Sequence, residues 1–319
     1  PSQTHGLLLA IPRRLFIPVS QLEWHDRDGL LCHSGDLSSL TTVQKALFEP
    51  MLALFNASGK IEQVAAKLPC TLLAGDGQLM QWMLQARPNF KLSKKNRAEL
   101  FIQSRLFQEG GIDGDKADGY LMPMIDLLNH HPDGATYRHN EVDQCVIDVA
   151  QPKPGTDECF VCYGNSDSLP IAVWHGYLEP CTRHVSALEC SFRYDPIGEI
   201  RIHGMDYIPS RHNAPKVTST EQGLDIHGFV MEPAKIGNLR VFISLAIRGR
   251  MRSLDQQQAE SHADRIVQRT IEINIFKYKE LYGICSQNDA PTAIRQLFMA
   301  LSIHQLAILN ALSVDMKTA

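Results

Sequence analysis

The sequence predicts an α+β protein, in which a β-rich part carries a helical insertion near its start and is followed by a helical tail. Residues 120–208 contain short apolar runs, rich in Val, Ile, Phe and Tyr, that alternate with turn residues, a pattern typical of strands. Residues 41–105 and the stretch after residue 222 instead repeat their apolar residues at helical spacing. A chain of 319 residues has room for about two domains.

The first expected elements are short strands. Residues 6–18 are apolar apart from a Pro-Arg-Arg break, which predicts one strand ending at Pro12 and a second over residues 15–17. The polar, glycine-containing residues 26–36 predict a loop.

A helical insertion comes next. Its periodic segments predict four helices, over residues 43–55, 60–68, 77–86 and 94–108. Thr42 and Ser93 are the expected caps of the first and the last of them. Pro50 should kink or split the first helix, because an internal proline removes a backbone hydrogen bond.

Strands and then helices fill the remainder. The apolar runs predict strands over residues 122–128, 144–150, 159–164, 185–192 and 200–204. The polar loop 209–222 contains two prolines and is the expected domain boundary. Beyond it the chain is expected to be helical to the end, with helices over residues 239–251, from Ser253 or Asp255 to Tyr282, and 293–312.

Composition and charge exclude several functional classes. A net charge of −4 and a pI of about 6.4 give no electrostatic basis for direct nucleic-acid binding. No apolar run approaches the roughly 20 residues of a membrane span, and no secretory signal is visible, so we expect a cytoplasmic protein, or a nuclear one in a eukaryote, without a membrane partner. The eight cysteines, including Cys159-x-x-Cys162, have no framework spacing and are expected to be reduced core thiols.

Polar clusters follow apolar segments in the stretch 120–179. Asn129-His130 ends one apolar run, Tyr163-Gly164 ends another, and His175-Gly176-Tyr177 follows twelve residues later. Separated polar clusters at the ends of apolar segments are what a buried ligand site is expected to look like in sequence.

With their flanking segments, these clusters resemble the SET-domain protein methyltransferases of the RuBisCO large-subunit methyltransferase class. The segments that carry the resemblance are GLLLAIPRRLFIP (6–18), QSRLF (103–107), MIDLLNHH (124–131), TDECFVCYGNSDS (156–168), WHGYLEP (174–180) and LRVFISLA (239–246). Each is weak alone, but their order and spacing together make a strong signal.

The resemblance implies a fold and a division into domains. It implies a split SET domain over residues 1–40 and 100–208, built of several small sheets with a pseudoknot. It also implies a helical insert over residues 41–99 and a helical substrate-binding domain over residues 209–319.

The resemblance also implies an activity, which is methyl transfer from S-adenosylmethionine to a protein, with a lysine amine as the expected target. Such an in-line displacement needs the cofactor and the amine aligned in a narrow, dry, tyrosine-lined channel. The implied catalytic residue is Tyr163, and the implied channel residues are Ser104 and His175. The implied cofactor-binding residues are Arg105, Asp126, Asn129, His130, Tyr163 and Tyr177.

Two departures from the family pattern leave alternatives open. The family's glycine-rich cofactor strand would precede Pro1, and the tyrosine of its Tyr-Gly-Phe step is His175 here. They favour a catalytically altered SET scaffold that binds a protein partner, or a protein-histidine methyltransferase. No metal is predicted, because His130, His131 and His139 lack the spacing of a closed zinc site.

Overall fold

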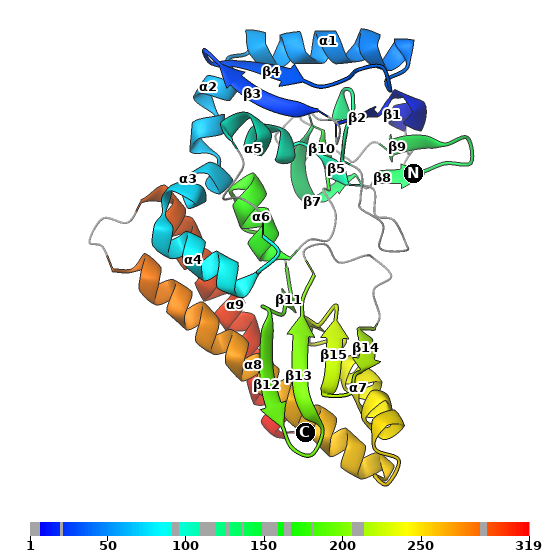
Figure 1. Ribbon diagram of the computed structural model, residues 1–319, viewed down its shortest axis with the longest axis vertical. Coiled ribbons are helices and arrows are strands. Elements are labelled where there is room, and N and C mark those ends of the chain that lie inside the picture. Colours follow the sequence, from blue (N-terminus) through cyan, green and yellow to red (C-terminus); the bar gives the residue numbers. More distant parts are fainter. Residues whose placement is uncertain are drawn as a thin grey trace, which may run out of the picture. The chain divides into compact units, whose positions relative to one another are not determined.

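The computed structural model of the chain describes residues 7–19, 22–90, 96–108, 119–125, 128–135, 137–148, 159–162, 167–179, 182–205, 214–287 and 292–318 (Figure 1). Contacts divide it into two compact units, Pro1–Leu72 with Lys91–Gly164, and Leu73–Phe90 with Asn165–Ala319. Several small sheets and helices at the C-terminal end make up the fold, which confirms the α+β prediction. The predicted boundaries of the SET domain, the insert and the substrate-binding domain stay predictions.

The first unit contains ten described strands in four small sheets. They are β1 (Leu7–Pro12), β2 (Ile17–Pro18), β3 (Glu23–Arg27), β4 (Leu30–Ser34), β5 (Phe107–Gln108), β6 (Gly119–Leu121), β7 (Asn129–Ala135), β8 (Tyr137–His139), β9 (Gln144–Asp148) and β10 (Phe160–Val161). The sheets have the strand orders β1-β9-β8, β2-β6-β5, β3-β4 and β10-β7. A 3₁₀ turn, Arg13–Leu15, separates β1 from β2, so the predicted early strand pair is present with the second strand two residues later.

The predicted loop over residues 26–36 is wrong, since this segment forms most of the β3–β4 hairpin. The two-residue turn is Asp28-Gly29, and both residues have positive φ, +53° and +79°. The Asp26 carboxylate accepts a hydrogen bond from the Gly29 N–H at 3.0 Å. Asp-Gly is a favoured hairpin dipeptide because both residues tolerate the left-handed region. The loop was predicted from the polarity of the segment, which does not distinguish a loop from a hairpin.

The helices of the first unit are α1 (Thr42–Ala57), α2 (Lys60–Gln63), the 3₁₀ turn Ala65–Lys67 and α5 (Arg97–Gln103). The cap of α1 is Thr41 and not Thr42, in a reciprocal capping box with Gln44. Helix α1 continues through Pro50, so the proline does not split it. Ala46 and Pro50 both lie on its exposed face, so water can reach the carbonyl that the proline leaves unpaired, while Phe48 and Phe55 anchor the other face.

Helix α5 is shorter than the predicted helix over residues 94–108. Asn96 caps it in a box with Glu99, and the Asn96 amide also donates to the Trp24 carbonyl at 2.7 Å. The expected cap Ser93 lies outside the described residues. Ser104 ends the helix because β5 begins at Phe107.

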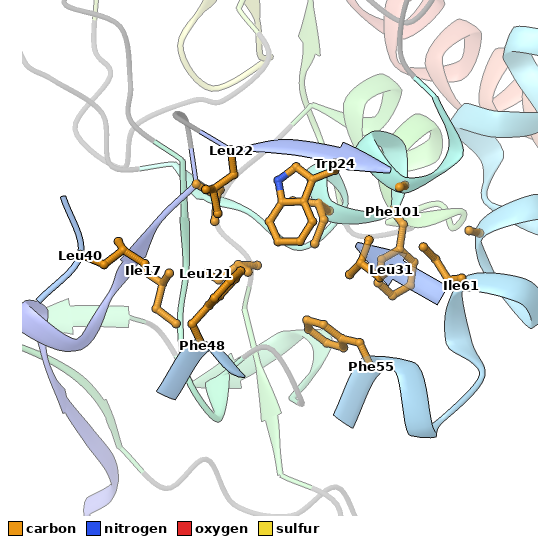
Figure 2. Packing of buried hydrophobic residues seen from close by; sticks show 14 residues of the cluster. Ile17, Leu22, Trp24, Leu31, Leu40, Phe48, Phe55, Ile61, Phe101 and Leu121 are labelled. Atoms are coloured by element: carbon orange, nitrogen blue, oxygen red, sulfur yellow. The ribbon is translucent and has the colours of Figure 1, made fainter. Parts of the chain in front are cut away.

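The main core of this unit lies between α1, α5 and the β3–β4 hairpin (Figure 2). Phe55 and Phe101 meet edge to face with ring centroids 5.7 Å apart, and Trp24 meets Phe48 at 6.0 Å. A second cluster under β1 and β9 includes Cys145, Ile147 and Val161. Burial of these side chains supplies the hydrophobic stabilisation of this unit.

The second unit combines two sheets with long helices. Its elements are α4 (Gly77–Ala86), α6 (Ser168–His175), β11 (Val185–Ser186), β12 (Cys190–Tyr194), β13 (Gly198–His203), β14 (Lys216–Ser219), β15 (Gly223–His227), β16 (Val230–Met231), α7 (Ile236–Arg250), α8 (Gln256–Cys285) and α9 (Ala293–Thr318). Helix α3 (Pro69–Gly75) spans the division between the units. The sheets have the orders β12-β13-β15-β14 and β11-β16.

Two expectations about the tail are wrong. Residues 216–231 contain β14, β15 and β16, so the chain is not helical throughout beyond residue 222. Helix α8 starts at the predicted cap Asp255 but continues through Gly283 to Cys285, because Leu281 and Cys285 are buried on the same face. The three long helices pack in sequence order, α7 on α8 and α8 on α9.

Residues 293–314 of α9 are long and apolar enough to cross a membrane by length and composition alone, so the prediction that no apolar run approaches a membrane span is wrong. The core helix of a soluble protein can pass the same test. One face of α9 is buried, with residues at three- and four-residue spacing: Ile294, Phe298, Leu301, Gln305, Leu309 and Leu312. Helix α9 packs on α8 and α6 through contacts within the same unit.

The described cysteines are the free thiols Cys32, Cys70, Cys145, Cys159, Cys162, Cys190 and Cys285, while Cys181 lies outside the described residues. Cys70, Cys145 and Cys285 are buried, as expected of core thiols, and the other four are partly exposed. Burial raises the pKa of Cys190 to about 11 and that of Cys285 to about 12. Since the thiolate is the reactive form, these two residues are poor nucleophiles near neutral pH.

Candidate functional site

The parallel pair β7–β10 brings together two segments that lie far apart in the sequence. Asn129 is the register partner of Phe160, and Ala135 is the partner of Val161, with a break between the two pairs. Residues 130–134 therefore lie between two successive pairing positions. The Cys162 N–H then donates to the Ala135 carbonyl at 2.8 Å. The Asn129-His130 cluster thus opens the strand that lies beside the segment leading to Tyr163.

Gly134 permits the close approach of these two strands. A Cβ at this position would lie 2.6 Å from the Val161 carbonyl carbon, 2.8 Å from the His131 oxygen and 3.0 Å from the Cys162 nitrogen. All three are backbone atoms, so no side chain can move away to make room. The His131 and Phe160 rings, one from each strand, have centroids 5.6 Å apart.

We expect Gly134→Ala to destabilise the protein by about 1–3 kcal/mol, because the added methyl group forces the backbones apart. Chemical denaturation followed by circular dichroism measures the change. The matched control is Gly237→Ala in the first turn of α7, where an added Cβ meets no atom within 4 Å. Equal stability changes in the two variants would contradict the close packing at Gly134.

Ser104 and Arg105 lie together at the C-terminal end of α5. The Arg105 guanidinium lies over the Phe101 ring at 3.7 Å from its centroid and donates from Nη1 to the Ser104 hydroxyl oxygen at 2.9 Å and to the Phe101 carbonyl at 3.1 Å. The Ser104 hydroxyl donates to the same carbonyl at 2.8 Å. Ring stacking and hydrogen bonds thus hold this cation in a defined orientation.

His175 and Tyr177 flank the C-terminal end of α6. Gly176 between them has φ +79° and caps the helix, and its N–H donates to the Ile171 carbonyl at 3.2 Å. This left-handed cap is why a glycine stands there. His175 is exposed, Tyr177 is half-buried, and their rings are 6.2 Å apart. The cap therefore presents an imidazole and a phenol side by side.

The predicted site residues are distributed over both units. Ser104, Arg105, Asn129 and His130 belong to the first unit, and His175 and Tyr177 belong to the second. Asp126 and Tyr163 lie outside the described residues. The structure thus describes three local arrangements, and the assignment of these eight residues to one site stays a prediction.

Sequence analysis missed Gly134 and a histidine cluster in the second unit. The cluster joins His203, Asp225 and His227, whose ligand atoms all lie within 4.8 Å of one another. A signal was present, because the tripeptide Ile-His-Gly occurs at residues 202–204 and again at 226–228, and Asp225 precedes the second copy.

Comparison with solved structures finds matches that cover nearly the whole chain. The chain is similar to the SET domain of LSMT bound to lysine and AdoHcy, at 12% identity and a TM-score of 0.42, over 98% of this chain and 82% of that one. It is similar to Rubisco LSMT bound to sinefungin and monomethyllysine, at 12% identity and a TM-score of 0.41, over the same shares. No protein-family model matches the chain, and no curated protein matches it. Neither family membership nor activity follows from likenesses of this size.

Proposed function

We propose that this chain is an S-adenosylmethionine-dependent protein N-methyltransferase that acts on lysine side chains. The observation that carries the proposal is the β7–β10 pair, which places the segment that begins with Asn129 against the strand that runs toward Tyr163. A methyltransferase of this kind needs its cofactor-binding residues beside its catalytic phenol. The resemblance of the sequence to split-SET enzymes assigns these two roles to the two paired segments.

The chemistry is an in-line displacement on the sulfonium methyl group by an unprotonated amine. Alignment of amine, methyl and sulfur in a water-excluded channel supplies most of the barrier reduction. Oxygen atoms around the methyl group stabilise it through weak C–H···O contacts. In the proposal these are the Tyr163 hydroxyl and backbone carbonyls near Ser104, Arg105 and Asp126.

The remaining residues bind the cofactor and the substrate. Arg105 pairs with the cofactor carboxylate, since a guanidinium matches a carboxylate in two hydrogen bonds. Asn129 and His130 hold the adenine and the amino-acid end, and Tyr177 stacks on adenine. His175 lies at the substrate channel, where the family has a tyrosine. The imidazole in place of the phenol would change which amine the channel accepts.

Binding is tested first by titrating the purified chain with S-adenosylmethionine in a calorimeter. We expect saturable binding of one cofactor per chain. Arg105→Met should weaken it by roughly 10-fold or more, because it removes a charge-assisted hydrogen bond. The control Arg193→Met alters an arginine that is 83% exposed and paired with the exposed Asp195. Absence of cofactor binding by the wild-type chain would remove the enzymatic proposal.

Catalysis is tested by transfer of a labelled methyl group to proteins of a cell lysate. Tyr163→Phe should lower the rate by roughly 100-fold or more, as loss of one preorganised polar group at a reacting centre does. The control is Tyr194→Phe, which removes a hydroxyl that lies 3.0 Å from His262 Nδ1 within the second unit. An equal loss in both variants would contradict a specific role for Tyr163.

Mass spectrometry of the labelled proteins then identifies the modified residue. Methyl-lysine supports the proposal as stated, whereas methyl-histidine would replace it with the histidine-specific alternative that His175 motivates. A binding scaffold would give a different result. It would capture one protein without the cofactor, retain that protein in Tyr163→Phe and transfer no methyl group to it.

A further inference from the structure

A cluster of three metal-ligating side chains lies at one end of the four-stranded sheet in the second unit. Strands β13 and β15 run parallel and side by side (Figure 1), with His203 in register with His227 and Arg201 in register with Asp225. Side chains alternate along a strand, so these residues share one face of the sheet, while the intervening Ile202 and Ile226 are fully buried on the other. The fold therefore fixes the three ligating positions.

The side chains of the cluster converge on one oxygen. His203 Nε2 lies 2.9 Å from Asp225 Oδ1, and His227 Nε2 lies 3.3 Å from the same atom. The other nitrogen of His203, Nδ1, lies 3.4 Å from Glu189 Oε2. The two imidazole rings are stacked 4.3 Å apart with an angle of 9° between their planes.

The unsatisfied oxygen of Asp225 points to a cation. Asp225 Oδ1 is buried and makes no hydrogen bond with the described residues, although the Nε2 atoms of His203 and His227 lie within 3.3 Å of it. A divalent ion held by the two Nε2 atoms and Asp225 Oδ1 would satisfy this oxygen and offset the charges of Asp225 and Glu189.

We propose that His203, Asp225 and His227 bind one divalent zinc-class ion. Ligands at about 2.0–2.2 Å from a tetrahedral Zn²⁺ lie roughly 3.3 Å from one another, close to the 2.9 and 3.3 Å separations in this cluster. Two imidazole nitrogens and one carboxylate oxygen are typical ligands for zinc and its first-row neighbours, whereas magnesium and calcium prefer oxygen ligands alone. Glu189 Oε2 lies 3.4 Å from His203 Nδ1, where it would favour the tautomer whose Nε2 is available to the metal.

Binding requires a small rearrangement of one ligand. Each nitrogen lone pair lies in its own ring plane, and the two planes are stacked nearly parallel, so the ring of His227 has to tilt for both nitrogens to reach one ion. His227 can do so, because its side chain is 52% exposed, against 27% for His203 and 25% for Asp225. The same exposure leaves a fourth coordination position for water or an external donor.

Two basic side chains near the cluster, Arg201 and Lys216, affect its affinity for a metal ion. Arg201 is held away by the Glu199 carboxylate at 2.8 Å and the Gln222 amide oxygen at 3.0 Å. Lys216 is the register partner of His227 on β14 and is exposed. Protons compete with the metal for the imidazoles, so acidification should release the ion.

The test is Zn²⁺ titration of the metal-stripped chain, measured by calorimetry and by elemental analysis after desalting. We expect one equivalent of Zn²⁺ per chain, and a loss of affinity of more than about 100-fold in His203→Gln and Asp225→Asn. The control His25→Gln removes an exposed histidine, hydrogen-bonded to Ser34 at 2.7 Å, and should bind zinc like wild type. No saturable uptake, or uptake unaffected by His203→Gln, would overturn the proposal.

Glu189→Gln tests the positioning role separately. We expect zinc affinity to fall by roughly 10- to 100-fold with one equivalent still bound, because the amide supports the His203 tautomer less well. Unchanged affinity would contradict the role of Glu189.

A measurement on the unaltered protein covers the case in which a variant does not fold. Co²⁺ bound to these ligands should give visible absorption bands that Zn²⁺ abolishes in a one-to-one titration. Thermal unfolding of the wild-type chain should also shift upward with Zn²⁺, since a ligand of the folded state stabilises it. Absence of both effects would overturn the site without reference to any variant.

Discussion

Asp167→Ala is expected to lower the free energy of unfolding by about 3–5 kcal/mol, the usual cost of breaking a buried ion pair. Asp167 is 0% exposed, and Arg87 is 7% exposed. Asp167 Oδ1 accepts the Ser186 N–H at 3.1 Å, and Oδ2 lies 3.8 Å from Arg87 Nη2. Arg87 also donates to the Ala187 carbonyl at 2.6 Å. The substitution removes the Asp167 carboxylate from beside this buried guanidinium.

Urea denaturation of Asp167→Ala, Asp167→Asn and wild type measures this effect. The asparagine variant retains an acceptor for Ser186 but not the charge, so we expect it to lie between the other two. The control Asp195→Ala breaks an ion pair with Arg193 in which both side chains are at least 80% exposed, and solvent screening should make its effect negligible. A loss in Asp167→Ala no larger than in this control would contradict the buried-pair argument.

The second large effect is expected at the start of α9. Arg295 donates from Nε and Nη2 to the two Asp76 oxygens at 2.8 and 3.2 Å. The same guanidinium also donates to the Gln78 side chain at 2.9 Å and to the Ile284 carbonyl at 2.9 Å. Asp76 also caps α4 by accepting the Leu79 N–H at 3.2 Å. Arg295→Met should therefore lower the free energy of unfolding by about 2–4 kcal/mol at pH 7, because it leaves a largely buried carboxylate unpaired.

The pH dependence of this loss follows from the pKa of Asp76. Burial raises that pKa, but hydrogen bonds from Arg295 and from the Leu79 N–H outweigh burial, so the pKa is lowered overall. A lowered carboxylate pKa stabilises the folded state above the ordinary aspartate pKa of about 3.9, and the stabilisation is lost as pH falls through the folded value. The difference between wild type and Arg295→Met should therefore shrink below about pH 4.

Denaturation curves at several pH values between 3 and 7 measure this difference. Arg269→Met is the control, since Arg269 lies on the exposed face of α8 and is paired at 3.3 Å with Glu272, both largely exposed. A difference for Arg295→Met that stays constant from pH 7 to pH 3 would contradict the coupling to Asp76.

Helices were predictable where the apolar spacing is sustained. Helix α7 and the start of α8 at Asp255 follow from periodicity and capping chemistry. The errors come from interactions that a local pattern does not contain. Pro50 is tolerated because its side of α1 is open to solvent, and the end of α8 is set by burial of Cys285 rather than by Gly283.

The site was predictable only as a set of local clusters. The Asn129-His130 and Tyr163 clusters stood out because each ends an apolar run, and the β7–β10 pairing joins their segments. The need for glycine at residue 134 arises from the Val161 backbone, which is distant in sequence. Likewise, His203 and His227 meet because β13 and β15 are parallel neighbours. The repeated Ile-His-Gly tripeptide marks both histidines, but it does not reveal that pairing.

The position of α4 in the chain has a consequence for biosynthesis. This helix belongs to the second unit, although most of that unit lies after residue 164. Its buried face includes Leu79, Trp82 and Met83, and the Trp82 indole donates to the Lys277 carbonyl, 195 residues later, at 3.1 Å. At a translation rate of about 5–20 residues per second, roughly 10–40 s pass between the synthesis of Trp82 and that of Lys277. During that time the apolar face of α4 can bind chaperones or neighbouring nascent chains. Aggregation of this protein should therefore be most frequent when translation beyond residue 90 is slow.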